Sequence, residues 1–180
     1  MTEFKSYTDQ VEVNGETVLS VIAAMEGESA RALKILASHG ITDPRPGEWY
    51  RQQLWLDAFK EIAETVGGES LYKIGRKIPY KAKFPPSVNT VEKALSSLNA
   101  TYHVNHRGGG IGSYRFIPTG ERKGIMVCQN PYPCNFDRGL IEAVIDRFSS
   151  GESSPATVRH DDTAPCRRAG SDYCTYLVEW

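Results

Sequence analysis

Residues 113–129 read SYRFIPTGERKGIMVCQ, in which two short segments with a repeat of two flank the turn sequence TGERKG. A repeat of two places successive side chains on opposite faces of a β-strand, and a turn that contains glycine can join two neighbouring strands. Two strands joined by a short turn pair in the antiparallel direction. This stretch therefore predicts an antiparallel sheet in the last part of the chain.

Toward the N-terminus, TYHVNHR has the same repeat and predicts an earlier strand over residues 100–107, joined to the next strand by GGGIG. Residues 1–99 instead carry apolar side chains at helical spacing, which predicts core-facing helices. Gly40 supplies a left-handed cap, and Ser87 begins the last helix of this part. The predicted helices cover residues 17–39 with a break near Gly27, 48–66, 69–78 and the segment after Ser87.

Toward the C-terminus, Asp137 is expected to cap a helix that ends before SSGESSP, and ATVRHD and YCTYLVEW predict two final strands. The predicted class is α+β, with an N-terminal helical layer packed on a C-terminal antiparallel sheet of four or five strands in β-β-β-α-β-β order. We expect one domain over residues 1–180, helical over 1–99, with the sheet and one helix over 100–180.

The charge balance argues against two classes of partner. The chain has 21 Lys and Arg and 22 Asp and Glu, a net charge of -1, and so lacks the basic surface that a nucleic acid requires. Its apolar stretches are far shorter than the roughly 20 residues of a membrane span, and its first residues show no signal-peptide pattern. We therefore expect a cytoplasmic protein that binds neither nucleic acid nor membrane.

The cysteines indicate a metal site. All four cysteines lie in the last third of the chain, and in a reducing compartment such a cluster indicates metal binding or a reactive thiol before disulfides. A turn at residues 170–172 can bring Cys166 and Cys174 together, and Cys134 precedes the predicted helix. Three thiolates and one more donor make a tetrahedral zinc site. The metal-ligand candidates are Cys128, Cys134, Cys166 and Cys174, with Cys128, His160, Asp161, Asp162 or water as fourth donor.

Other interpretations of these cysteines stay open. Free cysteines are often small buried hydrophobic residues, and a thiol can also serve redox chemistry. A second polar cluster contains His103 and His106, which face opposite sides of the predicted strand. Only one histidine can therefore face a pocket, as a ligand or haem contact, and the alternative is a histidine at the surface or satisfied in the core.

Two segments carry a resemblance to known families. They are PYPCNFDRGLIEAVIDRF at residues 131–148 and CRRAGSDYCTYLVEW at 166–180. They resemble vinyl-4-reductase-type domains and the N-terminal sensor domains of aromatic-responsive bacterial activators. The wider group includes haem nitric-oxide binding domains and TRAPP transport-tether subunits. The resemblance covers residues 100–180, and the helical half only in element order.

The resemblance implies an apolar ligand cavity between the helices and the sheet. We expect it to bind a small apolar or aromatic molecule, with Trp55, Phe59, Tyr102, His106 and Tyr114 as candidate contacts. The aromatic-sensing relatives hold zinc with a cysteine before the helix and a Glu-x-x-Cys-x7-Cys hairpin. Cys134, Cys166 and Cys174 match these positions, whereas Thr163 replaces the glutamate.

Haem is disfavoured by the same comparison. The haem-binding relatives carry a histidine on a helix and a Tyr-x-Ser-x-Arg signature. Here His103 and His106 fall in a predicted strand, and Ser113 to Arg115 does not reproduce that signature. We therefore expect zinc rather than haem as the cofactor.

The leading hypothesis is a small-molecule-binding regulatory or sensor domain with a cysteine-ligated zinc site, acting through a homodimer or a signalling partner protein. An enzyme is the less favoured class. The alternatives are a reductase-like or thiol-dependent enzyme, a haem-binding gas sensor, and a structural adaptor.

Overall fold

The C-terminal half of the chain forms a four-stranded antiparallel sheet in this computed structural model, which describes residues 3–25, 27–82, 84–149 and 156–180. The strand order is β4-β5-β7-β6. The bounds are β4 Ser113–Gly120, β5 Lys123–Gln129, β6 Thr157–His160 and β7 Cys174–Glu179. Strands β4 and β5 form the hairpin that residues 113–129 predict, so the expected antiparallel sheet is confirmed.

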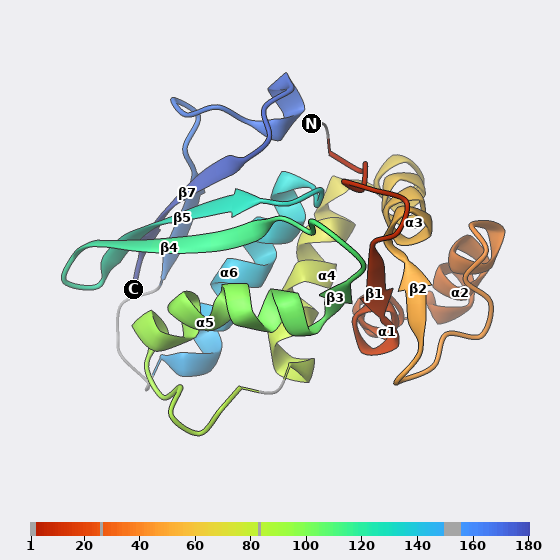
Figure 1. The fold of residues 1–180 in the computed structure, drawn as a ribbon, viewed down its shortest axis with the longest axis horizontal. Helices are drawn as coiled ribbons and strands as arrows, with labels where there is room; N and C mark the ends of the chain where they lie inside the picture. Colours follow the sequence, from red (N-terminus) through yellow and green to blue (C-terminus); the bar gives the residue numbers. More distant parts are fainter. Residues whose placement is uncertain (1–2, 26, 83, 150–155) are drawn as a thin grey trace.

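One face of this sheet is buried against a helix. Met126, Cys128, Tyr176 and Val178 alternate with less buried neighbours along β5 and β7, as a repeat of two requires. Helix α6, Cys134–Phe148, covers this face and packs closely on helix α4. Figure 1 shows α6 behind the strands and α5 along the lower edge of the sheet.

The N-terminal half is mainly helical. Its helices are α1 Gly15–Ala24, α2 Ser29–Ser38, α3 Gln52–Thr65, α4 Gly68–Lys81 and α5 Val91–Val104. A small second sheet has the order β2-β1-β3, with β1 Glu12–Asn14, β2 Trp49–Arg51 and β3 His106–Arg107. In the described part of the chain, six helices and two antiparallel sheets confirm the α+β class.

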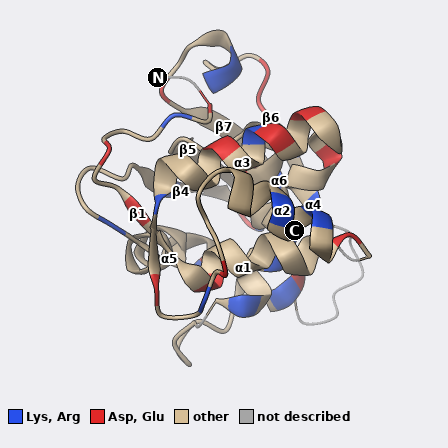
Figure 2. Cartoon of the chain, turned by 90° about the vertical axis from the view of Figure 1, so that its right-hand side faces the viewer, with Lys and Arg blue, Asp and Glu red and all other residues tan. Residues whose placement is uncertain are grey.

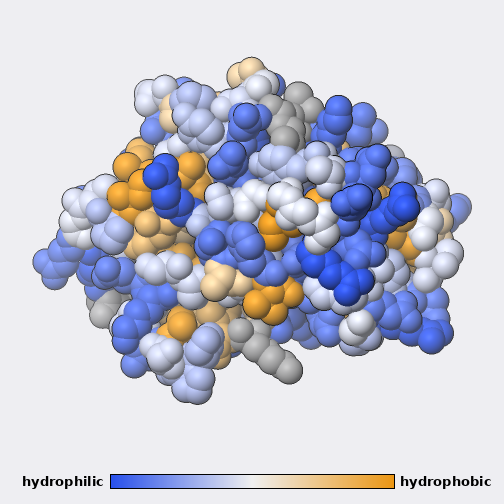
Figure 3. Space-filling model, viewed as in Figure 1, coloured by the Kyte–Doolittle hydropathy of each residue, from blue (hydrophilic) through white to orange (hydrophobic). Residues whose placement is uncertain are grey.

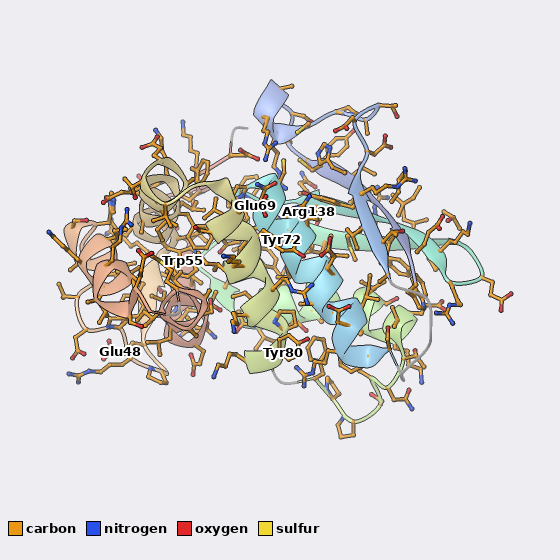
Figure 4. The ribbon with its side chains drawn as sticks, turned by 180° about the vertical axis from the view of Figure 1, so that it is seen from behind. Glu48, Trp55, Glu69, Tyr72, Tyr80 and Arg138 are labelled. Carbon is orange, nitrogen blue, oxygen red and sulfur yellow. The ribbon has the colours of Figure 1, made fainter. Side chains whose placement is uncertain are left out.

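Glycines allow α4 and α6 to approach closely. A Cβ atom added to Gly75 would lie 2.1 Å from the carbonyl oxygen of Phe136, and one added to Gly139 would lie 2.2 Å from that of Tyr72. Beside this contact, the guanidinium of Arg138 lies 4.8 Å from the centre of the Tyr72 ring. Figure 4 labels both residues on these neighbouring helices. The two helices thus pack closely against each other behind the sheet.

Several predicted boundaries are wrong. Residues 100–104 continue α5 rather than form a strand, because the buried side chains Leu95, Leu98 and Tyr102 follow helical spacing. Thr90 caps this helix in place of Ser87. The main sheet therefore has β-β-α-β-β order, and β1 and β2 have no counterpart among the predicted elements. The SSGESSP segment lies outside the described residues apart from Ser149.

The charges are distributed over the surface with both signs mixed, as Figure 2 shows for one side of the molecule. This agrees with the balanced composition. Within the described ranges, we find no helix that combines the length and the apolar character needed to cross a membrane.

Candidate ligand cavity and thiol cluster

An apolar cavity lies among the C-terminal end of α4, helix α5 and the start of α6. Its free volume is about 50 Å³, and none of the described side chains around it is Lys, Arg, Asp or Glu. An uncharged environment of this kind suits an apolar molecule. The lining residues are Thr17, Ile78, Pro79, Ala82, Phe84, Leu98, Thr101, Tyr102, Asn105, His106, Tyr114, Tyr132, Phe136 and Leu140.

His106 is the titratable base of this cavity. Burial lowers the pKa of His106 from 6.5 to about 4, so the imidazole is neutral at pH 7. Its Nδ1 lies 2.9 Å from the carbonyl oxygen of Tyr102, which can only accept, so Nδ1 carries the proton. Its Nε2 lies 2.6 Å from the hydroxyl of Tyr132 and therefore accepts from it. The lone pair of Nε2 thus points toward a group that also lines the cavity.

The structure brings together three of the five candidate ligand contacts, namely Tyr102, His106 and Tyr114. Trp55 and Phe59 do not line the cavity. They are fully buried on α3, where their ring centres lie 4.4 Å apart, and Phe59 packs 6.0 Å from Tyr132. Figure 4 shows Trp55 within the helical half. Tyr132 was not predicted, although it stands in the recognised PYPC segment.

Three cysteines converge in space. The Sγ atoms of Cys134 and Cys174 are 3.2 Å apart, and each lies 3.6 Å from Sγ of Cys166. Sulfurs around a tetrahedral zinc ion would be roughly 3.8 Å apart at a Zn–S distance of about 2.3 Å. His160 joins them, and the four ligand atoms lie within 4.8 Å of one another. This is the Cys3His donor set of structural zinc sites.

Each ligand candidate stands at the end of an element. Cys134 begins α6, Cys174 begins β7, and His160 ends β6. Cys166 precedes the short 3-10 helix η1, Arg167–Ala169, and Gly170 follows it with a φ of 87°, which a glycine adopts without strain. The turn therefore brings the two hairpin cysteines together as the sequence predicts.

His160 is oriented like a metal ligand. Its Nδ1 lies 2.9 Å from Oδ1 of Asp162, and its Nε2 is buried and has no hydrogen-bond partner among the described residues. A carboxylate on one ring nitrogen commonly orients the other nitrogen toward a metal. Asp162 therefore orients His160, the candidate fourth metal ligand. Asp161 instead accepts hydrogen bonds from Thr163.

Cys128 lies outside this group. It pairs in register with Cys174 on one side and with Tyr114 on the other, fully buried inside the sheet. Burial and the nearby Asp137 raise the pKa of Cys128 well above its ordinary value. It is therefore a protonated core residue that lies outside the group of four potential ligands, and we do not include it in the candidate metal site.

Glu3 contacts the cluster without having been predicted. Its Oε1 lies 2.9 Å from the backbone nitrogen of Cys134 and 3.0 Å from its Sγ. No local motif in the sequence signals this contact, because 131 positions separate the two residues. The N-terminal segment thus lies against the first turn of α6.

A buried arginine connects the thiol cluster to the cavity. Nε of Arg167 lies 3.3 Å from Sγ of Cys174, and Nη2 lies 2.5 Å from Oδ2 of Asp137. The other oxygen of Asp137 accepts a hydrogen bond of 2.6 Å from Tyr114, which lines the cavity. Arg167 also donates to the carbonyl oxygen of Asn130 at 2.7 Å. Asp137 is thus a buried ion-pair partner within α6, and its predicted role as the cap of that helix was wrong.

The thiols have unequal proton affinities. The hydrogen bond from the Cys134 thiol holds the pKa of Cys174 well below its ordinary range, with the charge of Arg167 acting in the same direction. The same bond, together with burial, raises the pKa of Cys134. A thiolate at Cys174 is the form that binds metal.

Comparisons with known proteins show the fold. No protein-family model matches the chain, and no curated protein sequence matches it significantly. An H-NOX protein from S. oneidensis in the Fe(II) ligation state has a TM-score of 0.68 at 14% identity, covering 92% of this chain and 95% of that one. A mutant T. Tengcongensis H-NOX has a TM-score of 0.68 at 16% identity, covering 92% and 96%.

These similarities show that the chain shares the fold of H-NOX structures, and they give no support to the vinyl-4-reductase resemblance. A further structure, described as "Probing the function of heme distortion in the H-NOX family", has a TM-score of 0.68 at 16% identity, covering 93% of this chain and 94% of that one. The expectation that haem is disfavoured is therefore contradicted. That expectation relied on the missing signature and on a strand at residues 100–107; His103 instead lies on α5, whereas His106 begins the short strand β3.

Replacement of Arg167 is expected to destabilise the fold. The pair of Arg167 and Asp137 is 1% and 0% exposed, and removal of one partner leaves an uncompensated buried charge. We predict that Arg167→Met lowers the free energy of unfolding by about 3 to 5 kcal/mol in urea titrations. Arg168→Met is the matched control, because this side chain is 58% exposed, and it should change stability by less than about 0.5 kcal/mol. Equal effects would contradict the role of the buried pair.

The lowered pKa of His106 predicts that the protein loses stability in acid. This pKa is about 4 in the folded chain and 6.5 in the unfolded one, so the unfolded state binds more protons between these values. The free energy of unfolding should fall by about 3 kcal/mol as the pH drops through this window. His106→Gln should remove this part of the pH dependence in urea titrations, whereas His103→Gln at the exposed neighbour should not. A wild-type slope in His106→Gln would refute the assignment.

Proposed function

We propose that this chain is a sensor domain that binds a small ligand in the cavity beside His106. The observation that carries the proposal is a neutral imidazole at the wall of an apolar cavity, with its proton fixed on Nδ1 and its Nε2 accepting a hydrogen bond from Tyr132, which also lines the cavity. Such a nitrogen can accept a hydrogen bond from a ligand or bind a metal. The shared fold of the H-NOX structures is consistent with a sensor.

The cavity must widen for a ligand to enter. Its volume of about 50 Å³ is below the roughly 300 to 1,000 Å³ of ligand pockets. The last turn of α4 forms one wall and contains Pro79, which lacks the N–H that would tie it to the preceding turn. Arg147 reaches across from α6 to the carbonyl oxygens of Pro79 and Ala82. We infer that this wall moves when a ligand binds.

Two ligand classes fit the chemistry of the cavity. The described lining residues carry no Lys, Arg, Asp or Glu, which favours a small apolar or aromatic molecule. Haem is the second class, since a neutral imidazole with a fixed Nδ1 proton is a suitable iron ligand, and His106 is the residue that would hold the iron. When bound, haem would supply a site for a diatomic gas. For either ligand to reach Nε2 of His106, the hydrogen bond from Tyr132 to this nitrogen has to break.

The two classes are distinguished by titrating the purified protein with hemin and with the uncharged fluorophore N-phenyl-1-naphthylamine. A sensor is expected to bind one equivalent of at least one of them. If hemin binds, the absorption spectrum should report an axial imidazole that is lost in His106→Leu and kept in the control His103→Leu. If the aromatic probe binds, Leu98→Phe, which fills the cavity, should weaken it.

Failure of both probes to bind stoichiometrically would refute a ligand-binding cavity. Loss of the imidazole spectrum in His103→Leu alone would instead move the iron ligand to the exposed histidine on α5.

We further propose that Cys134, Cys166, Cys174 and His160 bind a structural zinc ion. The supporting observations are three sulfurs 3.2 to 3.6 Å apart and a buried imidazole nitrogen of His160 that has no hydrogen-bond partner in the described part of the chain. These residues come from α6, β6 and the β7 hairpin. One ion would therefore fasten the hairpin to the helix that backs the cavity.

Zinc binding is tested by calorimetric titration of metal-free reduced protein. One zinc ion per chain and a raised melting temperature are expected, because a ligand that binds only the folded state stabilises it. Cys174→Ser should abolish stoichiometric binding, and Asp162→Asn should weaken it by roughly 10- to 100-fold. Cys128→Ser is the control, since Cys128 lies outside the group, and it should bind like wild type. Unchanged binding in Cys174→Ser would exclude this site.

A further inference from the structure

The outward face of the main sheet carries an apolar patch. Ile117 pairs in register with Ile125, and Ile125 pairs with Leu177, which forms one row across β4, β5 and β7. Val127 continues the patch in the next row on the same face. Ile117 is 37% exposed and the other three are half-buried. Helix α6 lies on the opposite face of the sheet (Figure 1).

The patch is visible at the surface. Figure 3 shows hydrophobic side chains gathered over the region of β4, β5 and β7, with hydrophilic side chains among and around them. At one end of the patch, Tyr173 is 36% exposed on the hairpin before β7. A hollow there is lined by Arg115, Val127, Gln129 and Tyr173 among others. The apolar surface thus continues into a concave end.

Two arginines flank the patch. Arg115 stands opposite Val127 in the register, and Arg159 stands opposite Leu177, so both point to the outward face. Both are exposed, and within the described residues neither takes part in an ion pair. Two acidic residues lie near the patch: Glu179 pairs with Lys123 at 3.1 Å, and Asp172 lines the hollow with Arg115. Arg115 and Arg159 therefore place positive charge on the rim that takes part in no ion pair within the described residues.

We propose that this outward face is a docking site for an acidic amphipathic helix of a partner protein. The row of Ile117, Ile125 and Leu177 would receive the apolar stripe, and Arg115 and Arg159 would meet carboxylates along its flanks. A second copy of this chain is the poorer occupant, because a face-to-face dimer would present the same arginines and the same paired glutamate from both sides. The proposal does not depend on which ligand occupies the cavity.

The position suits the transmission of a signal. Strand β7 contributes Leu177 to the outward face and begins at Cys174 in the thiol cluster. Its inward side chains Tyr176 and Val178 pack against the core. A partner on this face would therefore contact the strand that the hairpin and its cysteines position.

The probe is a synthetic helical peptide of about 20 residues with leucines on one face and glutamates on its flanks, labelled for fluorescence anisotropy. A matched peptide carries lysines in place of the glutamates. We expect the acidic peptide to bind and the basic one not to bind, with affinity that falls as salt is added. Ile117→Asp and the double variant Arg115→Glu with Arg159→Glu should each weaken binding at least about tenfold.

Leu33→Asp is the control, because Leu33 on α2 is 41% exposed, close to the 37% of Ile117. It should leave peptide binding unchanged, and circular dichroism should show that all variants fold. Equal binding of both peptides, or no binding of the acidic one, would overturn the proposal. A wild-type dimer in sedimentation equilibrium that Ile117→Asp converts to a monomer would assign the face to a second copy instead.

Discussion

The buried ion pair between Arg167 and Asp137 is the constraint on which the functional half of the molecule depends. Arg167 lies on the hairpin before β7 and Asp137 on α6, and the pair is almost completely excluded from solvent. A buried charge is costly unless it is paired. Separation of the hairpin from the helix would therefore leave one of the two charged groups buried without its partner, or expose both to solvent. Further hydrogen bonds to Asn130 and to Cys174 complete the donors of the guanidinium. The convergence of the cysteines follows from this attachment.

The same pair places the thiol cluster and the cavity in one connected structure. Asp137 accepts from Tyr114, and the ring of Tyr114 packs on Tyr102, which in turn packs on His106. A ligand that shifts these rings would act on the carboxylate that holds Arg167. A metal ion at the cysteines would act on the same arginine from the other side. The two sites therefore share a contact, and this gives the combination of cavity and metal site a physical basis.

The sequence predicts these features unequally. The hairpin at residues 113–129 and the approach of Cys166 to Cys174 follow from local patterns, because a repeat of two and a short turn determine them. Cys134 joins them from 32 positions away along the chain, which no local pattern determines. The helical end of α5 was misread, since the alternation of Tyr102, Val104 and His106 resembles a strand while Val104 is in fact 74% exposed on a helix. The contacts of Tyr132 and Glu3 join distant segments, and no local pattern encodes them.

The central claim is that the hairpin and α6 converge on one metal ion with three sulfur ligands and one nitrogen ligand. X-ray absorption at the zinc edge of the protein loaded with one equivalent tests it most directly. The account predicts a first shell of three sulfurs at about 2.3 Å and one nitrogen at about 2.0 Å. A shell of four sulfurs, which would require Cys128, or a shell of oxygen and nitrogen alone would contradict it.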